Sequence, residues 1–252
     1  MPLRTPCSLL FDPPGDGAWN MAVDESLLDA FAEGDRCCWR FYAWRVPTLS
    51  LGYFQSIKDR RLHPASMACP VVRRASGGGA ILHDVELTYS FIAAAGSALA
   101  KQSSRLYDVV HKTLIITLAQ LGVSDASLFG QPRGGTDDRL PFLCFERRSP
   151  GDVVYGGQTK IAGSAQRRRH GAVLQHGSVL LGRSAAAPEL PGIADLTGRN
   201  VTPGELVEAW LPRLEEHLGL AFSNRALDDD QRRRAERYVE AKYASDAWTV
   251  HR

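Results

Sequence analysis

The stretch VVRRASGGGAILHDVELTYSF, Val71–Phe91, carries three consecutive glycines between short apolar runs. An interior glycine costs roughly 0.5–1 kcal/mol relative to alanine, so the triplet Gly77–Gly79 needs a physical reason. Either the chain turns there with φ > 0, or another group approaches the backbone more closely than a Cβ would allow. Residue types alone leave both explanations open. The triplet is not a phosphate loop, because no Gly-Lys-Ser/Thr follows it and it does not open a helix.

The apolar runs around the triplet predict a sheet. Strands expected at 71–74, 80–83 and 87–92 lie too close together for parallel crossovers, which need a dozen or more residues. The glycines are therefore expected to form a hairpin-like turn within a sheet. The side chains predicted to lie beside this turn are Arg73, Arg74, Ser76, His83 and Asp84.

Periodicity further out predicts the remaining elements. Apolar residues at helical spacing indicate helices at 19–31, 106–121 and 203–218, and a last helix is expected at about 228–243. Two strands around Pro47 are expected within 38–53, and further strands at 152–155, 159–166 and 172–181. No internal repeat or linker interrupts the chain, so the sequence predicts a single domain spanning 1–252.

Composition narrows the classes of function. The chain has 252 residues, 44% of them hydrophobic, and a formal charge of +2, so no global field favours nucleic acid or an anionic membrane. No apolar run reaches the ~18 residues of a membrane helix, and no signal peptide is visible, which predicts a cytoplasmic protein. The five cysteines are an odd number without CxxC spacing, so neither a disulfide framework nor a metal site is expected.

Two residues downstream could carry chemistry. In GQTKIAGSAQ, strand alternation would place Lys160, Ala162 and Ser164 on one face, a cation beside small side chains. Cys144, in FLCFE, could be a thiol held near that ammonium. A lysine on a strand is commonly a solvated edge charge, and a cysteine between apolar residues is commonly a buried hydrophobe. Together, however, they could provide a thiolate that attacks an acyl carbon.

Three other features are weighed in the same way. The basic run QRRRHG, 166–171, is predicted to be a solvated turn, with phosphate binding as the alternative. His176 lies on an apolar strand and is expected to be a hydrogen-bonded core histidine. The segment Ser127–Phe142 lacks periodicity and is expected to be a surface loop that could act as a lid over a site near Cys144.

Taken in order, several segments resemble the lipoate-protein ligase and octanoyltransferase family, within the biotin/lipoate A/B ligase superfamily. They are WNMAVDESLL, RFYAWRVPTLSLGYFQ, RRASGGGAILHDVELTYSF, KIAGSAQRRRHGAVLQHGSVLL and KYASDAWTVHR. The resemblance spans nearly the whole chain. It implies an α+β fold with a mixed, largely antiparallel sheet and flanking helices, related to the class II synthetase-like fold.

The resemblance also implies a site. The glycine loop would line an acyl-binding tunnel, with Arg74, Ser76, Gly77, Gly78, Gly79, His83, Asp84, Gly163 and Ser164 contacting substrate. The lysine that matches Lys160 would contact the acyl carbonyl. The segment CFERRSPGDVVYGGQTKIAGSAQ is similar to the LipM-type octanoyltransferases, in which a cysteine at the position of Cys144 is the nucleophile.

Acyl transfer is accordingly the expected activity, from acyl carrier protein to a lysine of a lipoyl domain or glycine-cleavage H protein, without a cofactor. The alternative is an ATP- and Mg-dependent lipoate-protein ligase with a separate accessory protein, since no C-terminal accessory domain is expected in this chain. A lesser alternative is a non-catalytic acyl- or RNA-binding module that uses 166–171 as its phosphate patch.

Overall fold

A large mixed sheet forms the centre of the molecule. The computed structural model describes residues 4–32, 36–130 and 141–250. The sheet has the strand order β11-β1-β2-β6-β10-β9-β8-β7. Its strands are β1 (Thr5–Phe11), β2 (Cys37–Tyr42), β6 (Glu86–Ala93), β7 (Ala126–Leu128), β8 (Val153–Tyr155), β9 (Thr159–Arg169), β10 (Ala172–Leu180) and β11 (Leu220–Asn224). Strand β1 pairs in parallel with β2 and β11, and the other neighbouring pairs are antiparallel, which confirms the predicted sheet.

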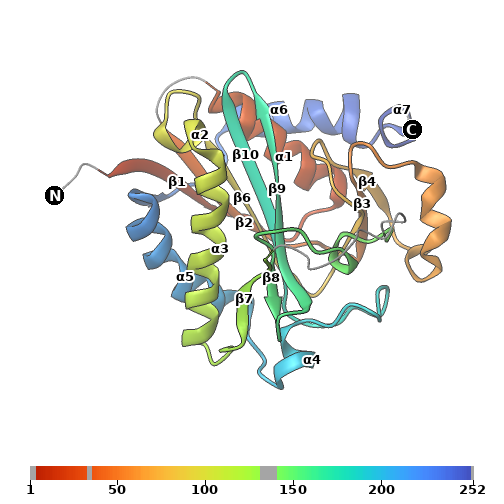
Figure 1. The fold of residues 1–252 in the computed structure, drawn as a ribbon. Helices are drawn as coiled ribbons and strands as arrows, with labels where there is room; N and C mark the ends of the chain where they lie inside the picture. Colours follow the sequence, from red (N-terminus) through yellow and green to blue (C-terminus); the bar gives the residue numbers. More distant parts are fainter. Residues whose placement is uncertain (1–3, 33–35, 131–140, 251–252) are drawn as a thin grey trace.

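Helices cover both faces of this sheet (Figure 1). They are α1 (Gly17–Ala30), α2 (Ala98–Lys101), α3 (Ser103–Gln120), α4 (Ile193–Thr197), α5 (Pro203–Leu218), α6 (Asp229–Tyr238) and α7 (Asp246–Thr249). Successive side chains of β2 point to opposite faces of the large sheet. Cys37, Trp39 and Phe41 pack with α3 and α5, whereas Cys38 and Tyr42 pack with α1 and α6. We call these the α3 face and the α1 face.

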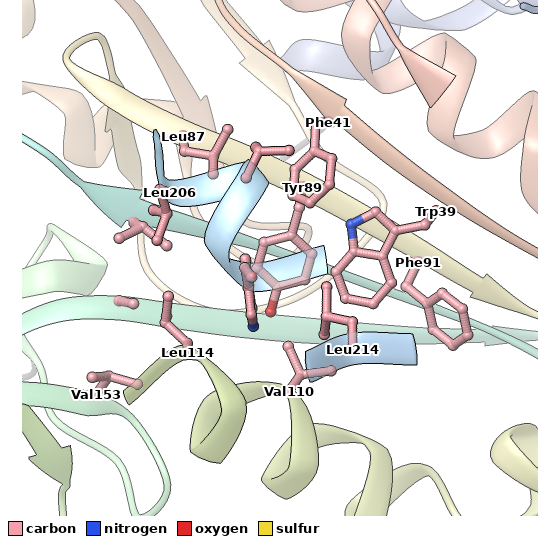
Figure 2. Close-up of a cluster of buried hydrophobic side chains, with 14 of the residues drawn as sticks. Trp39, Phe41, Leu87, Tyr89, Phe91, Val110, Leu114, Val153, Leu206 and Leu214 are labelled. Atoms are coloured by element: carbon pink, nitrogen blue, oxygen red, sulfur yellow. The ribbon is translucent and has the colours of Figure 1, made fainter. Parts of the chain in front are cut away.

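The α3 face holds the larger core. Figure 2 shows Trp39, Tyr89 and Leu214 among the buried side chains between the sheet and the helices. Trp39 stacks on Tyr89 with ring centroids 5.3 Å apart and meets Trp210 of α5 edge-on at 5.9 Å. Aromatic pairs at these distances contribute beyond their buried area, so they fix how α5 sits on the sheet.

A second, three-stranded sheet corrects the hairpin prediction. Its order is β4-β3-β5, with β3 (Thr48–Leu51) between β4 (Val71–Arg73) and β5 (Ile81–His83). The two strands that flank the glycine triplet therefore do not pair with each other. β3 lies parallel to β4 and antiparallel to β5, so the glycine loop must arch over its end. Strands that are close together in the sequence need not pair, because a strand from elsewhere in the chain can lie between them.

A bulge in β9 overturns the predicted face for Lys160, Ala162 and Ser164. Val153 of β8 pairs with Ala162, but Val154 pairs with Lys160, so Ile161 is an extra residue. Ile161 and Ala162 both lie in the α3-face core. Beyond the bulge, Ser164 pairs with Gly177, which pairs with Tyr89 of that same core. Strict alternation cannot anticipate such an inserted residue.

Other predicted segments differ in detail from the structure. Residues 166–169 of the basic run belong to β9, and only His170 and Gly171 form the turn. The last helix is α6 followed by a π-helical turn, Val239–Tyr243. Short 3₁₀ turns occur at Ile57–Leu62, Pro64–Ser66 and Cys144–Glu146. Residues 131–140 of the expected lid lie outside the described residues. Among the described residues, no helix is long and apolar enough to cross a membrane.

Candidate active site

A cavity of about 170 Å³ lies on the α1 face, between the glycine loop and the large sheet. Four residues that are directly paired across strands line its floor: Gly163, Ser178, Thr88 and Tyr42. Residues paired in this way point to the same side of a sheet. At about 4.8 Å per strand, the row crosses roughly 14 Å from β9 to β2. A larger depression of about 580 Å³, near Arg4 and Arg105, contains none of the predicted site residues.

Cys144 and Lys160 meet at this cavity. Lys160 Nζ lies 3.8 Å from Cys144 Sγ, and both residues line the wall. The N–H of Cys144 donates to the carbonyl of Ala80 at 2.7 Å, and the N–H of Ala80 donates to the carbonyl of Phe142 at 3.0 Å. Phe142 is buried in the core of the small sheet. The thiol is thus anchored to the end of the glycine loop.

Asp152 is a site residue that the sequence did not single out. Its Oδ2 lies 2.8 Å from Lys160 Nζ and also accepts from the N–H of Ser149 at 2.8 Å. Its Oδ1 accepts from the hydroxyl of Tyr107 on α3 at 3.2 Å. The side chains of Lys160 and Asp152 are only 5% and 3% exposed, so Lys160 belongs to a buried ion pair and is not a solvated edge charge.

The glycine at 163 makes this ion pair possible. A Cβ at that position would lie 2.5 Å from Lys160 Cε and 3.1 Å from Asp152 Oδ1. Real Cβ atoms essentially never show the first of these distances, and the second is tighter than most real Cβ contacts. The absence of a Cβ at Gly163 therefore leaves room for the Lys160 head, and this reason for a glycine does not depend on a contact with substrate.

Arg74 organises the glycine loop from inside. Its guanidinium donates to the carbonyls of Gly77 at 2.7 Å, Gly79 at 2.6 Å and Ser50 at 3.0 Å. Burial lowers the pKa of Arg74 to about 10, while the nearby Cys144 acts in the opposite direction. Arg74 borders the cavity, but these three bonds show that it holds the loop backbone.

Each glycine of the triplet has its own reason. Gly78 has φ +93°, and a Cβ there would lie 3.0 Å from Arg74 Nη2 and 4.0 Å from Cys144 Sγ. A Cβ at Gly79 would lie 3.0 Å from the backbone nitrogen of Cys144. At Gly77 it would meet only Phe54, at an ordinary 3.7 Å. The protein's own atoms thus account for glycine at 78 and 79, so an acyl chain is not needed to explain the whole triplet.

Backbone N–H groups of the loop are available to a ligand. Within the described part of the chain, the N–H groups of Gly77, Gly78 and Gly79 have no protein acceptor. The glycine loop can therefore donate to an oxyanion that develops in the cavity.

Ser164 turns its hydroxyl away, towards the α3 face. Ser164 Oγ lies 2.6 Å from His111 Nε2 and 2.6 Å from the Tyr89 hydroxyl. His111 Nδ1 donates to the carbonyl of Gly151 at 2.6 Å, and burial lowers the pKa of His111. Although Ser164 borders the cavity, its side chain braces strand against helix.

The other predicted residues separate into two groups. His83 lines the cavity, stacked on Trp44 at 3.9 Å and bonded to Glu86 Oε1 at 2.6 Å. Ser76 and Asp84 do not line it. Ser76 bonds His176 Nε2 at 2.5 Å and faces a neighbouring cavity of about 300 Å³. Asp84 accepts from Ser184 Oγ at 2.7 Å.

His176 is buried, as expected, but it also lines the cavity. Burial lowers its pKa to about 4, and Asp24, 3.7 Å from Nδ1, only partly offsets that effect.

None of the other four cysteines lines this cavity. Burial raises the pKa of Cys7, Cys38 and Cys69, and none of these borders the cavity. Within residues 4–32, 36–130 and 141–250, no group of three or more His, Cys, Asp or Glu side chains is placed to hold a metal ion.

Comparison with known proteins places this geometry in a family. Residues 16–187 match the family described as the lipoyl protein ligase A/B catalytic domain. Octanoyltransferase LipM of Geobacillus kaustophilus is 35% identical, over 93% of this chain and 94% of that protein. LipM of Symbiobacterium thermophilum is 34% identical, over 94% and 95%.

A solved structure shares the fold. It is a bi-partite lipoate protein ligase from Thermoplasma acidophilum, studied with its E2 lipoyl domain. Its TM-score is 0.75 at 21% identity, covering 98% of this chain and 96% of that one. The shared fold agrees with the family match, and so does the identity of 35% and 34% to two LipM proteins over nearly the full length of the chain. The chain therefore belongs to the lipoyl protein ligase A/B catalytic-domain family.

Proposed function

We propose that this protein is an octanoyltransferase of protein lipoylation, which moves an octanoyl group through a Cys144 thioester to a lysine of an acceptor protein. The observation that carries the proposal is the 3.8 Å contact between Cys144 Sγ and Lys160 Nζ in the cavity wall. The similarity to LipM octanoyltransferases over more than nine-tenths of the chain supports it.

In the first step, the Cys144 thiolate attacks the carbonyl carbon of the donor thioester. The new C–S bond forms as the donor C–S bond breaks, and the donor thiolate takes up a proton. An ammonium beside the sulfur favours the thiolate, and backbone N–H groups of the glycine loop would bind the developing oxyanion. The apolar atoms of the roughly 14 Å floor would cover the chain at about 0.8 kcal/mol per buried methylene.

In the second step, the acceptor amine attacks the enzyme thioester. The C–N bond forms, the C–S bond breaks, and Cys144 leaves as thiolate beside Lys160 while the amine proton passes to solvent. One thioester replaces another and an amide is the final product, so the reaction needs no ATP, Mg or other cofactor. We propose acyl carrier protein as donor, and lipoyl domains or glycine-cleavage H protein as acceptors. The lipoyl domain studied with the Thermoplasma ligase is consistent with that acceptor class.

Intact-mass measurement after incubation with octanoyl-acyl carrier protein, without ATP, tests the proposal. We expect one hydroxylamine-labile octanoyl adduct on the wild type and none on Cys144→Ala, which keeps the other four cysteines. If Cys144→Ala still modifies a lipoyl domain at the wild-type rate, or if activity requires ATP and free lipoate, the chain is a ligase instead. Salt-dependent RNA binding without an adduct would favour the non-catalytic alternative.

A further inference from the structure

Lys160 has two neighbours that can carry a negative charge, and only Asp152 can carry it throughout the reaction. Its ammonium lies 2.8 Å from Asp152 Oδ2 and 3.8 Å from Cys144 Sγ. Once Cys144 carries an acyl group, its sulfur can no longer be a thiolate. The Asp152 carboxylate is then the remaining counter-charge in contact with this buried ammonium among the described residues.

Asp152 is itself held from several sides, as a fixed counter-charge should be. Ser149 donates its N–H to Oδ2, and Tyr107 donates its hydroxyl to Oδ1. Four residues after Tyr107, and so on the same face of α3, His111 binds the carbonyl of Gly151, the residue before Asp152. One face of α3 therefore forms hydrogen bonds both to the Asp152 side chain and to the backbone of the preceding residue, Gly151.

The three N–H bonds of an ammonium can serve three partners. One is directed to Asp152 and one to Cys144, which leaves the third for a group in the cavity. With Asp152 fixing one direction, the ammonium cannot follow the sulfur when the thiolate charge is lost. It remains where the acyl carbonyl and the departing sulfur need positive charge.

We propose that Asp152 is a positioning residue specific to the acyl-enzyme stage, which holds the Lys160 ammonium in place for transfer to the acceptor amine. This inference rests on the proposed function. Before loading, a Cys144 thiolate would itself balance the charge of the Lys160 ammonium. In the acyl-enzyme a lysine lacking Asp152 would be a buried, uncompensated charge, which is strongly unfavourable. Loss of the carboxylate should therefore harm the second half-reaction more than the first.

Asp152→Asn tests this, because the amide keeps the shape and one acceptor oxygen but removes the charge. Loading is followed by intact mass with octanoyl-acyl carrier protein. Transfer is followed in single turnover from the isolated acyl-enzyme to a lipoyl domain. We expect loading within about tenfold of wild type, transfer slowed about 100-fold or more, and an acyl-enzyme that accumulates at steady state.

Two further variants keep the test decisive. Tyr107→Phe removes the hydroxyl on Oδ1 and should slow transfer several-fold, with little change in loading, even if Asp152→Asn fails to fold. Asp195→Asn removes a carboxylate of α4 that pairs with Arg183, and neither residue lines the cavity, so both half-reactions should be unchanged.

The outcomes separate the two claims. Transfer at the wild-type rate in Asp152→Asn, or equal losses in loading and transfer in both site variants, overturns the role assigned to Asp152. If wild-type Cys144 takes up no octanoyl group at all, it is the proposed function that fails.

Discussion

Substituting Gly163 by alanine tests whether the position of the Lys160 head controls activity. The added Cβ would lie 2.5 Å from Lys160 Cε and 2.9 Å from Nζ, whereas an ordinary contact begins at 3.4 Å. The lysine head must therefore move by about 0.9 Å. That shift would strain its 2.8 Å contact with Asp152 and its 3.8 Å contact with Cys144.

A loss of activity and a moderate loss of stability are both expected. A misplacement of about 1 Å at a reacting centre can lower a rate about 100-fold. An added methyl group in a packed site costs about 1–3 kcal/mol, and replacing glycine recovers about 0.4–1 kcal/mol from the unfolded chain. We therefore expect the free energy of unfolding of Gly163→Ala to fall by no more than about 2.6 kcal/mol.

Octanoyl loading of Cys144, followed by mass, and thermal unfolding measure the two quantities. Gly204→Ala is the matched control, because a Cβ at Gly204 meets no atom within 4 Å, and it should load at the wild-type rate. Loading by Gly163→Ala within about threefold of wild type, with an unchanged melting temperature, would show that the lysine position is unimportant. A large loss of stability would show that the strand moves instead of the side chain.

Three other substitutions probe neighbouring features. Lys160→Ala and Lys160→Arg should each reduce turnover about 100-fold or more, because a planar guanidinium cannot replace a compact ammonium in a buried ion pair; near wild-type turnover in both would remove Lys160 from the mechanism. Gly78→Val should lower both stability, by at least about 1–2 kcal/mol, and loading, because φ is +93° and a Cβ would press on Arg74; an unchanged melting temperature would contradict this geometry. Burial lowers the pKa of His176 from 6.5 to about 4, so the unfolded chain binds a proton in that window that the folded chain does not. Stability should thus fall on the order of 3 kcal/mol as pH drops from 6.5 to 4, and His176→Gln should flatten that part of a plot of melting temperature against pH; identical plots would refute the assignment.

The sequence determined most of the local structure because local structure depends on local patterns. Apolar spacing predicted α1, α3 and α5, and β-branched runs predicted β2, β6, β8, β9 and β10 of the large sheet, but not β1, β7 or β11. Cys144 and Lys160 were also proposed from the sequence, because a thiol and an ammonium are chemically informative wherever they occur. The glycine loop was identified for a similar reason, since three glycines in a row are costly unless the backbone requires them.

The tertiary structure alone decided which of these parts meet. Pairing across the sheet placed β3 between β4 and β5, and one extra residue at Ile161 moved Ala162 and Ser164 to the opposite face. Periodicity in the sequence predicts which residues share one face of a strand or helix, but it does not show which part of the protein packs against that face.

The polar partners in the site were hidden for the same reason. Asp152 lies 45 residues from Tyr107 in the sequence, and the serine partner of His111 lies 53 residues away. His111 was visible only as a polar residue on the apolar stripe of a helix, and Asp152 only as the residue before a short strand. Conversely, Ser76 and Asp84 lie close to the glycine loop along the chain, yet neither lines the cavity, because Ser76 bonds His176 and Asp84 bonds Ser184. Nearness in sequence places a backbone, but the direction of each side chain depends on hydrogen-bond partners that only the folded chain brings within reach.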